Sequence, residues 1–327
     1  MFGLCACIAF LFLVAEISTS PTPTIEKRSE RTSAPSGCLT VGTGGTYTTF
    51  GDALAVLGSS TDAACIYLAS GTYEEQNTID YPGSLTIYGE TTYVESYKDN
   101  TVTITYSQTS DEAADLQASA TIQVVSSGVS FYNINVVNGY GAGTQAVALT
   151  LNGDELALYA CQVIGYQDTL YVLAGTQYIA NSLIQGNVDF IFGGASVWIT
   201  NCDIEFNGAG GSITASARDT DDDTWFVIDT SNIEAASGYL TTEDNYLGRP
   251  WGALARVQYQ YCMITDVINP AGWSTLAADA TPLFYEYENT GDGSSTTDRL
   301  YETVSPGSVD ITTVLGTDYA DWVITDF

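Results

Sequence analysis

Short apolar runs recur along the chain, each beside Asn, Ser or Cys, at intervals of roughly 20 to 31 residues, a period typical of repeat proteins. One shift of the chain along itself places Cys161–Gly165 on Ser182–Gly186 and also carries Asp168 onto Asp189. A further shift of similar length carries Ser182 onto Cys202. This self-similarity predicts a solenoid in which each coil covers the apolar face of its neighbour.

Looser copies of the same run surround Ile134, Ser231 and Cys262. The runs are short and rich in Val, Ile, Thr and Tyr, which favours strands over helices. Equal positions on successive coils of such a stack lie about one strand spacing apart, roughly 5 Å. We therefore expect Asp168 and Asp189 to be two carboxylates that face each other from adjacent coils.

Two stretches outside the repeats complete the expected fold of a single β-rich domain. A helix-like stretch at Gly51–Gly58 is expected to cover the N-terminal end of the stack. The segment from Gly291 onward lacks ladder-like runs and is expected to pack along the outside. A folded part of about 300 residues is long enough to bury a large core.

Residues 1–36 are expected to lie outside this domain. Residues 1–18 are apolar and then turn polar, and the apolar run is too short for a membrane span, so they read as a signal peptide, with a retained anchor as the alternative. Residues 19–36 are rich in Pro, Ser and Thr and are expected to be extended and mobile. Lys27-Arg28 is a candidate processing site, and the folded domain is assigned to residues 37–327.

The cysteines divide into two groups. Cys38 and Cys65 each open a strand on either side of the helix-like stretch, and the sequence leaves open whether they form a disulfide, which a secreted protein permits. Alternate coils lie about 10 Å apart, too far for a disulfide. Three cysteines at the same repeat position are therefore expected to be small buried free thiols: Cys161, Cys202 and Cys262.

The charge balance excludes several classes of function. The chain has 39 acidic residues, 8 Lys plus Arg and no His, for a formal net charge of −31. Such a surface repels nucleic acid and anionic membranes, which bind clustered Lys and Arg. The absence of His excludes a Ser-His-Asp mechanism and makes a zinc enzyme improbable. Acid–base chemistry must then fall to carboxylates.

Six motifs occur in an order that resembles one known family. They are GTYEE (Gly71–Glu75), QAVAL (Gln145–Leu149), GYQDTLY (Gly165–Tyr171), GNVDFIFG (Gly186–Gly193), LGRPW (Leu247–Trp251) and NPAGW (Asn269–Trp273). Together they resemble the pectinesterases, or pectin methylesterases, of the fungal type. The resemblance runs from about Thr40 to Glu288, most of the folded chain.

The resemblance implies an all-β fold, a single-stranded right-handed parallel β-helix with a short N-terminal helix cap, that hydrolyses C6 methyl esters of galacturonate in pectin. Asp189 matches the nucleophile, and Arg249 matches the Arg that pairs with it and favours its charged form. Asp168 matches the general acid and base. Two carboxylates so close cannot both ionise cheaply, so the one without the Arg should have a raised pKa.

The remaining site residues also follow from the resemblance. Gln145 and Gln167 match the pair whose amides donate to the developing oxyanion. Four aromatic residues match positions that line the polysaccharide cleft: Tyr171, Phe192, Trp251 and Trp273. Gly71, Tyr73 and Glu75 are interpreted as architectural, although they belong to a motif. We expect no metal or other cofactor, pectin as the partner, and a secreted monomer that binds neither nucleic acid nor membranes.

Other activities of β-helix proteins remain as alternatives. A polygalacturonase would need a set of Asp residues, usually with a His, around a glycosidic bond. A pectate lyase would need a calcium site of clustered acids, for which Thr220–Asp223 with Arg218 is a poor candidate. A silent carbohydrate-binding or cell-wall structural β-helix is the alternative from outside the enzymes.

Overall fold

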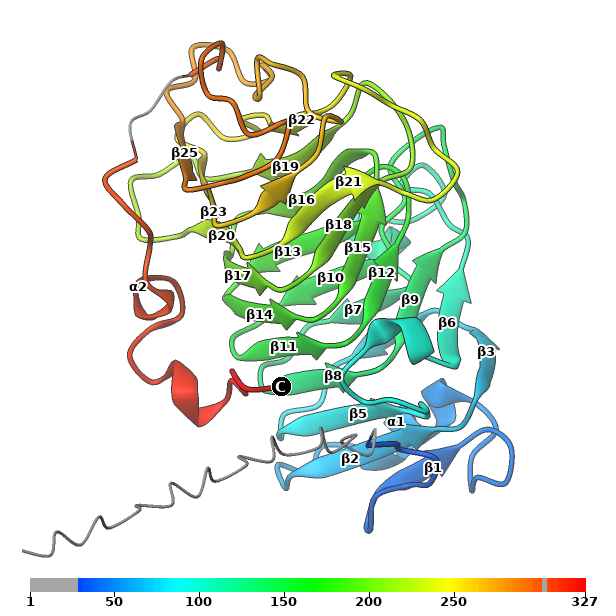
Figure 1. Ribbon diagram of the computed structural model, residues 1–327. Helices are drawn as coiled ribbons and strands as arrows, with labels where there is room; N and C mark the ends of the chain where they lie inside the picture. Colours follow the sequence, from blue (N-terminus) through cyan, green and yellow to red (C-terminus); the bar gives the residue numbers. More distant parts are fainter. Residues whose placement is uncertain (1–28, 302–304) are drawn as a thin grey trace, which may run out of the picture.

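Three parallel sheets run the length of the molecule and wrap the chain into a right-handed β-helix (Figure 1). The structure is a computed structural model that describes residues 29–301 and 305–327. Each regular coil contributes one strand to each sheet, and strands of successive coils pair in parallel. The predicted fold is confirmed.

The sheets are named by their numbers of strands. The ten-stranded sheet contains β1 (Leu39–Val41), β2 (Ala64–Leu68), β5 (Leu85–Gly89), β8 (Val129–Tyr132), β11 (Leu156–Tyr159), β14 (Thr176–Ala180), β17 (Ser196–Thr200), β20 (Phe226–Asp229), β23 (Arg256–Gln260) and β25 (Leu283–Tyr287). The eight-stranded sheet contains β3 (Gly71–Glu74), β6 (Val102–Tyr106), β9 (Asn135–Asn138), β12 (Gln162–Ile164), β15 (Leu183–Gly186), β18 (Asp203–Phe206), β21 (Asn232–Ala235) and β24 (Met263–Ile264). The seven-stranded sheet contains β4 (Asn77–Ile79), β7 (Ile122–Val124), β10 (Leu149–Asn152), β13 (Leu170–Ala174), β16 (Val188–Gly193), β19 (Ser212–Ser216) and β22 (Tyr246–Gly248).

The strand register agrees with the spacing of the repeats. Gln162 pairs with Leu183, and Leu183 pairs with Asp203, which are the partners that the two shifts of the sequence predict. The looser copies also pair as expected, because Asn135 lies beside Gln162 and Asn232 lies beside Asp203. The core between the sheets consists of buried aliphatic and aromatic side chains that alternate with outward residues along each strand.

On six coils, from β8–β9 to β23–β24, the ten-stranded sheet is joined to the eight-stranded sheet by a two-residue bend of one conformation. The first residue of each bend has a positive φ: Asn133, Ala160, Asn181, Asn201, Thr230 and Tyr261. On all but the first of these coils, the second residue is Cys or Ser. The hydroxyl of Ser182 accepts a hydrogen bond from the backbone N–H of Cys161 at 3.0 Å, and that of Ser231 from Cys202 at 3.1 Å. Cys161, Cys202 and Cys262 are buried and free, as predicted.

Helix α1 (Phe50–Leu57) covers the N-terminal end and buries Phe50 and Ala53. The hydroxyl of Thr49 accepts from the N–H of Asp52 and caps the helix. The Glu75 carboxylate accepts 2.9 Å hydrogen bonds from the first N–H groups of the same helix, where the helix dipole favours a negative charge. Glu75 therefore has the architectural role expected of it.

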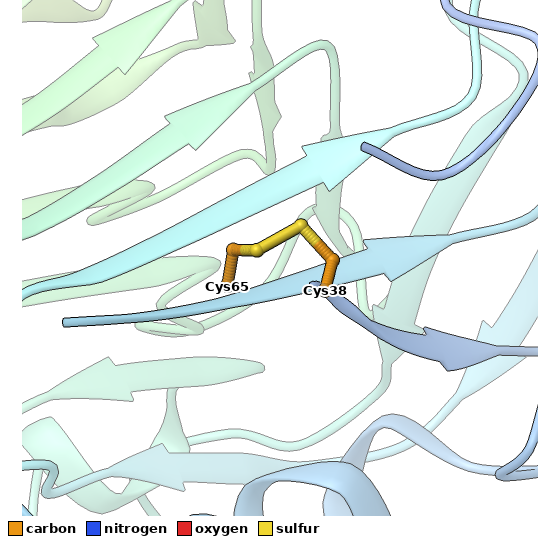
Figure 2. The surroundings of a disulfide bond; sticks show 2 residues. All are labelled: Cys38 and Cys65. Atoms are coloured by element: carbon orange, nitrogen blue, oxygen red, sulfur yellow. A yellow bond between two sulfur atoms is a disulfide. The ribbon is translucent and has the colours of Figure 1, made fainter. Parts of the chain in front are cut away.

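Cys38 and Cys65 form a disulfide beside this end of the stack (Figure 2). The packed chain also begins before the boundary expected at residue 37. Arg31 donates its N–H to Thr91 at 3.0 Å, and its guanidinium lies 4.6 Å from the ring centroid of Tyr88. The predicted signal at 1–18, the segment at 19–28 and Lys27-Arg28 lie outside the described residues.

The C-terminal segment packs along the outside of the ten-stranded sheet, as expected (Figure 1). Helix α2 (Ile311–Leu315) contacts β14 and β17 and buries Val314 and Leu315. Three short 3₁₀ helices complete the described part of the chain: η1 (Tyr97–Asp99), η2 (Gln117–Ser119) and η3 (Tyr319–Asp321). Within residues 29–301 and 305–327, no helix is long and apolar enough to cross a membrane.

Candidate active site

The two predicted carboxylates lie on adjacent coils where the chain enters the seven-stranded sheet. Asp168 stands just before β13 and Asp189 lies in β16, and the pairing of Leu170 with Ile191 sets these coils in the register that the repeat predicts. The N–H of Asp168 donates to the carbonyl of Val188 at 2.9 Å. Both aspartates have positive φ, 62° and 51°, a backbone conformation that Asp tolerates better than most residues. Both carboxylates line one pocket.

Arg249 follows β22 and binds Asp189 through two parallel hydrogen bonds. Its Nε donates to Oδ1 at 2.8 Å and its Nη2 donates to Oδ2 at 2.7 Å. This bidentate geometry fixes the carboxylate in one plane. The hydrogen bonds from Arg249 to Asp189, and the negative charge of Asp189 itself, raise the pKa of Arg249, so the guanidinium stays charged. The backbone of Arg249 is fixed by its own N–H, which donates to the carbonyl of Thr214 at 2.9 Å.

Asp168 has the opposite environment. It is only 4% exposed and has no basic partner of its own among the described residues, although Gln145 Nε2 donates to its Oδ2 at 2.7 Å. Burial raises the pKa of Asp168 to about 7, with a further contribution from the nearby Asp189 charge. The hydrogen bond from Gln145 and the charge of Arg249 oppose this rise. Asp168 therefore holds its proton in mildly acidic solution.

The two glutamines reach the pocket from different coils. Gln145 lies in the segment between β9 and β10, and Gln167 lies beside Asp168 and pairs through its backbone with Val188. The carbonyl of Gln167 accepts from the N–H of Ala146 at 3.1 Å, which ties the two segments together. Both side chains line the pocket. In this structure one amide hydrogen of Gln145 is directed at Asp168, which leaves its second amide hydrogen for another acceptor.

The pocket has a volume of about 260 Å³. Its lining consists of Gln145, Gln167, Asp168, Asp189, Phe192, Ala215, Arg249, Trp251 and Leu276. Trp251 is 42% exposed at the rim. Phe192 is buried and stacks on Tyr171 with ring centroids 4.3 Å apart, so Tyr171, which was also expected in the cleft, lies behind Phe192 and does not itself line the pocket. Ala215 and Leu276 are additional lining residues that no motif in the sequence marked.

Trp273 does not lie in the pocket, in contrast to the expectation from its motif. It is 2% exposed and stacks on Phe284 in the core with ring centroids 4.1 Å apart. Its indole N–H donates to Glu286 at 3.2 Å, and Glu286 forms an ion pair with Arg299 at 2.8 Å. The backbone of Trp273 pairs with Gly248, next to Arg249, so Trp273 helps to hold the segment that carries Arg249 in place.

These groups suit one kind of chemistry. A carboxylate oriented by a guanidinium stands beside a carboxyl group that holds its proton, and amide donors point to the same space. Among the described residues, no group of three or more Cys, Asp or Glu side chains is placed to hold a metal ion. The fold and the pocket together are those of a β-helical ester hydrolase.

Comparison with known proteins identifies the family. The pectinesterase family model matches residues 39–306. A probable pectinesterase A of Aspergillus niger is 61% identical over 316 residues, which cover 96% of each chain. The crystal structure of a pectin methylesterase from Aspergillus niger is 62% identical, with a TM-score of 0.90, and the match covers 91% of this chain and 100% of that chain. The pectin methylesterase from carrot is 30% identical, with a TM-score of 0.79, covering 89% of this chain and 96% of that chain.

The chain belongs to the pectinesterase family and is a carboxylic ester hydrolase. The resemblance drawn from the six motifs is thereby confirmed.

Proposed function

We propose that this enzyme removes the C6 methyl esters of galacturonate units in pectin through an acyl-enzyme formed on Asp189. The single observation that carries the proposal is the pair of differently charged carboxyl groups in one pocket. Asp189 is held by two hydrogen bonds from Arg249, whereas Asp168 is buried and has a pKa of about 7. The names of the relatives support the substrate class.

In the first half of the reaction, an Asp189 oxygen attacks the ester carbonyl carbon and forms a tetrahedral intermediate. Amide hydrogens of Gln145 and Gln167 donate to its oxyanion. When the intermediate collapses, the carbon–oxygen bond to the methoxy group breaks and Asp168 transfers its proton to that oxygen. Methanol leaves, and the acyl group remains bound to Asp189 as an anhydride.

In the second half, Asp168 is ionised and accepts a proton from a water molecule that attacks the acyl carbonyl. The anhydride bond breaks, the galacturonate acid is released, and the Asp189 carboxylate is restored. Asp168 regains its proton, so acid and base roles alternate in one group. Since the cycle begins with protonated Asp168, turnover should decline as the pH rises above about 7.

The exposed Trp251 provides a face on which a sugar ring can stack, next to the Phe192–Tyr171 wall. We propose that a sugar ring stacks on Trp251, and that the buried Phe192, supported by Tyr171, closes the side of the pocket. Secretion and a monomeric state remain part of the proposal. Secretion rests on the apolar segment at residues 1–18, and the monomer on the net charge of −31, because like charges oppose self-association.

The test is a time course of methanol and chain length on highly methylated pectin with a chelator present. We expect methanol without chain shortening, whereas reducing ends or unsaturated products would support the glycosidase or lyase alternatives. Asp189→Ala should abolish methanol release and leave pectin binding intact. Asp203→Asn, on the eight-stranded sheet, is the control and should remain active. Unchanged turnover by Asp189→Ala would refute the mechanism.

A further inference from the structure

A single buried amide fastens together two segments that enter the seven-stranded sheet ahead of the carboxylates. These segments are residues 107–121, between β6 and β7, and residues 139–148, between β9 and β10. The amide belongs to Asn138, the last residue of β9, which is 3% exposed. Asn138 lies outside the pocket lining, so no motif or pocket contact assigns it a role.

The Asn138 side chain is hydrogen-bonded through both its NH2 group and its carbonyl oxygen. Its Nδ2 donates to the carbonyls of Gln108 and Val147 at 2.9 Å each, with the carbonyl of Ser119 at 3.3 Å as a weaker third acceptor. Its Oδ1 accepts from the N–H of Tyr140 at 3.2 Å. The acceptors lie on both segments, so this one side chain crosslinks them. A buried amide with every partner in place rigidifies its surroundings.

The crosslinked segments determine where Gln145 stands. The N–H of Ser110, in the first segment, donates to the carbonyl of Gln145, in the second, at 2.9 Å. The side chain of Gln145 in turn donates to Asp168 at 2.7 Å. A path therefore leads from Asn138 to the acid of the proposed reaction: a hydrogen bond to Gln108, two residues of backbone to Ser110, and hydrogen bonds from Ser110 to Gln145 and from Gln145 to Asp168.

Apolar packing joins the same segments to the pocket wall. Leu116 from the first segment and Val147 from the second pack in one cluster with Phe192 and Tyr171. The hydroxyl of Ser119, which is fully buried, accepts from the N–H of Val147 at 3.2 Å. The position of the first segment is thus transmitted both to Gln145 and to the aromatic wall.

We propose that Asn138 is a positioning residue of the reaction, which holds Gln145 in hydrogen-bonding contact with Asp168. The inference rests on the proposed function, because it assigns Asn138 to the support of that acid. Asn138 itself touches no reacting atom, so it acts only through the loops that it crosslinks.

Replacing the amide should change the pH profile as well as the rate. In Asn138→Ala the two segments lose the hydrogen bonds of the amide, so that fewer bonds hold them together and Gln145 moves away from Asp168. A misplacement of this kind reduces kcat by roughly ten- to a hundred-fold. The Gln145 hydrogen bond holds the pKa of Asp168 down, so its loss moves the alkaline limb of the kcat profile to higher pH.

The other titratable and charged groups that face Asp168 are Asp189, Arg249 and Tyr171. The substitution leaves the ion pair of Asp189 and Arg249 in place. Tyr171 packs against the first segment and can shift with it, but its raised pKa keeps it uncharged over this pH range, so a shift of the limb reports on Gln145. A merely structural role for Asn138 would lower the unfolding midpoint and the active fraction without moving the limb.

The experiment measures kcat, KM and the pH profile of methanol release for the wild type, Asn138→Ala and Asn135→Ala. Asn135 lies in the same strand with a hydrogen-bonded amide that donates to Thr103, away from the pocket, and its variant should keep the wild-type profile. Ser119→Ala removes another side-chain link between the segments and should give a smaller change of the same sign. It keeps the test decisive if Asn138→Ala fails to fold.

A folded Asn138→Ala or Ser119→Ala variant with the wild-type kcat and alkaline limb would overturn the proposal. So would a lower rate that is fully accounted for by unfolded protein. Failure of the proposed function is seen separately, because Asp189→Ala would then still release methanol.

Discussion

Replacing Asp168 by Asn should alter the dependence of stability on pH in a way that follows from its burial. The pKa of Asp168 is raised from 3.8 to about 7 in the folded chain. Between these values the folded state holds a proton that the unfolded state has lost. The wild type therefore loses stability as the pH rises through this window, because the ionised carboxylate must be kept in a buried site.

The magnitude follows from the two pKa values. Their difference corresponds to roughly 4 kcal/mol between pH 4 and pH 8, as an upper bound, because water entry relieves an ionised buried group. Asp168→Asn carries no charge at either pH and should escape this loss. The variant should accordingly gain stability relative to the wild type at pH 8 but not at pH 4. It should also be inactive, since an amide cannot exchange the proton.

Urea unfolding at pH 4, 6 and 8 measures the effect, with equal m-values as the check that the unfolded states are comparable. Asp203→Asn is a control for which the change in stability at neutral pH should have the opposite sign. Burial would raise the pKa of Asp203, but hydrogen bonds from Tyr97 and Asn232 and the charge of Lys98 outweigh it and lower the pKa. Its replacement should therefore cost stability at neutral pH. If the free energies of unfolding of wild type and Asp168→Asn run parallel from pH 4 to pH 8, the burial argument fails.

Three further substitutions test other parts of the structure. Arg249→Met removes both hydrogen bonds to Asp189, the proposed nucleophile, and should lower kcat by roughly a hundred-fold or more, measured as methanol release at saturating pectin. Trp251→Ala should raise KM with little effect on the unfolding midpoint, whereas Trp273→Phe, in the core, should lower the midpoint and leave KM nearly unchanged; equal KM effects would contradict the two placements. Replacing Cys38 and Cys65 together by Ser should lower the free energy of unfolding by about 3.5 kcal/mol, from a separation of 27 residues, without loss of activity in the folded enzyme.

The paired carboxylates could be predicted from the sequence because strand pairing converts sequence spacing into spatial proximity. The repeat interval that aligns Cys161 with Ser182 is the register that the strands adopt, and it carries Asp168 next to Asp189. The direction of the Asp168 pKa could also be predicted. Its main cause, burial, could not, because the spacing of the repeats does not show how deeply a side chain at the edge of a sheet is covered.

The placements that the sequence did not reveal involve irregular segments. Trp273 belongs to a stretch that pairs with β22 through an isolated bridge, so no alternation indicates that its ring points inward. Leu276 reaches the pocket from the same stretch, without any motif. Residues 107–121 are polar and aperiodic, and no pattern in them predicts that Leu116 packs beside Phe192 and Tyr171. Arg31 lies in a segment whose composition is typical of disorder, yet it stacks on Tyr88.

The six uniform bends between the ten-stranded and eight-stranded sheets have an evolutionary consequence. On these six coils the bend is always two residues long, so differences in loop length are accommodated at the other two corners, which flank the seven-stranded sheet; the earlier β5–β6 connection, residues 90–101, is longer. Insertions and deletions there can reshape the rim of the pocket while Asp189, which lies within β16, keeps its place in the lattice of strands. A lineage could thus acquire a preference for a different polysaccharide by exchanging these loops alone, while the reacting groups of the pocket stay the same.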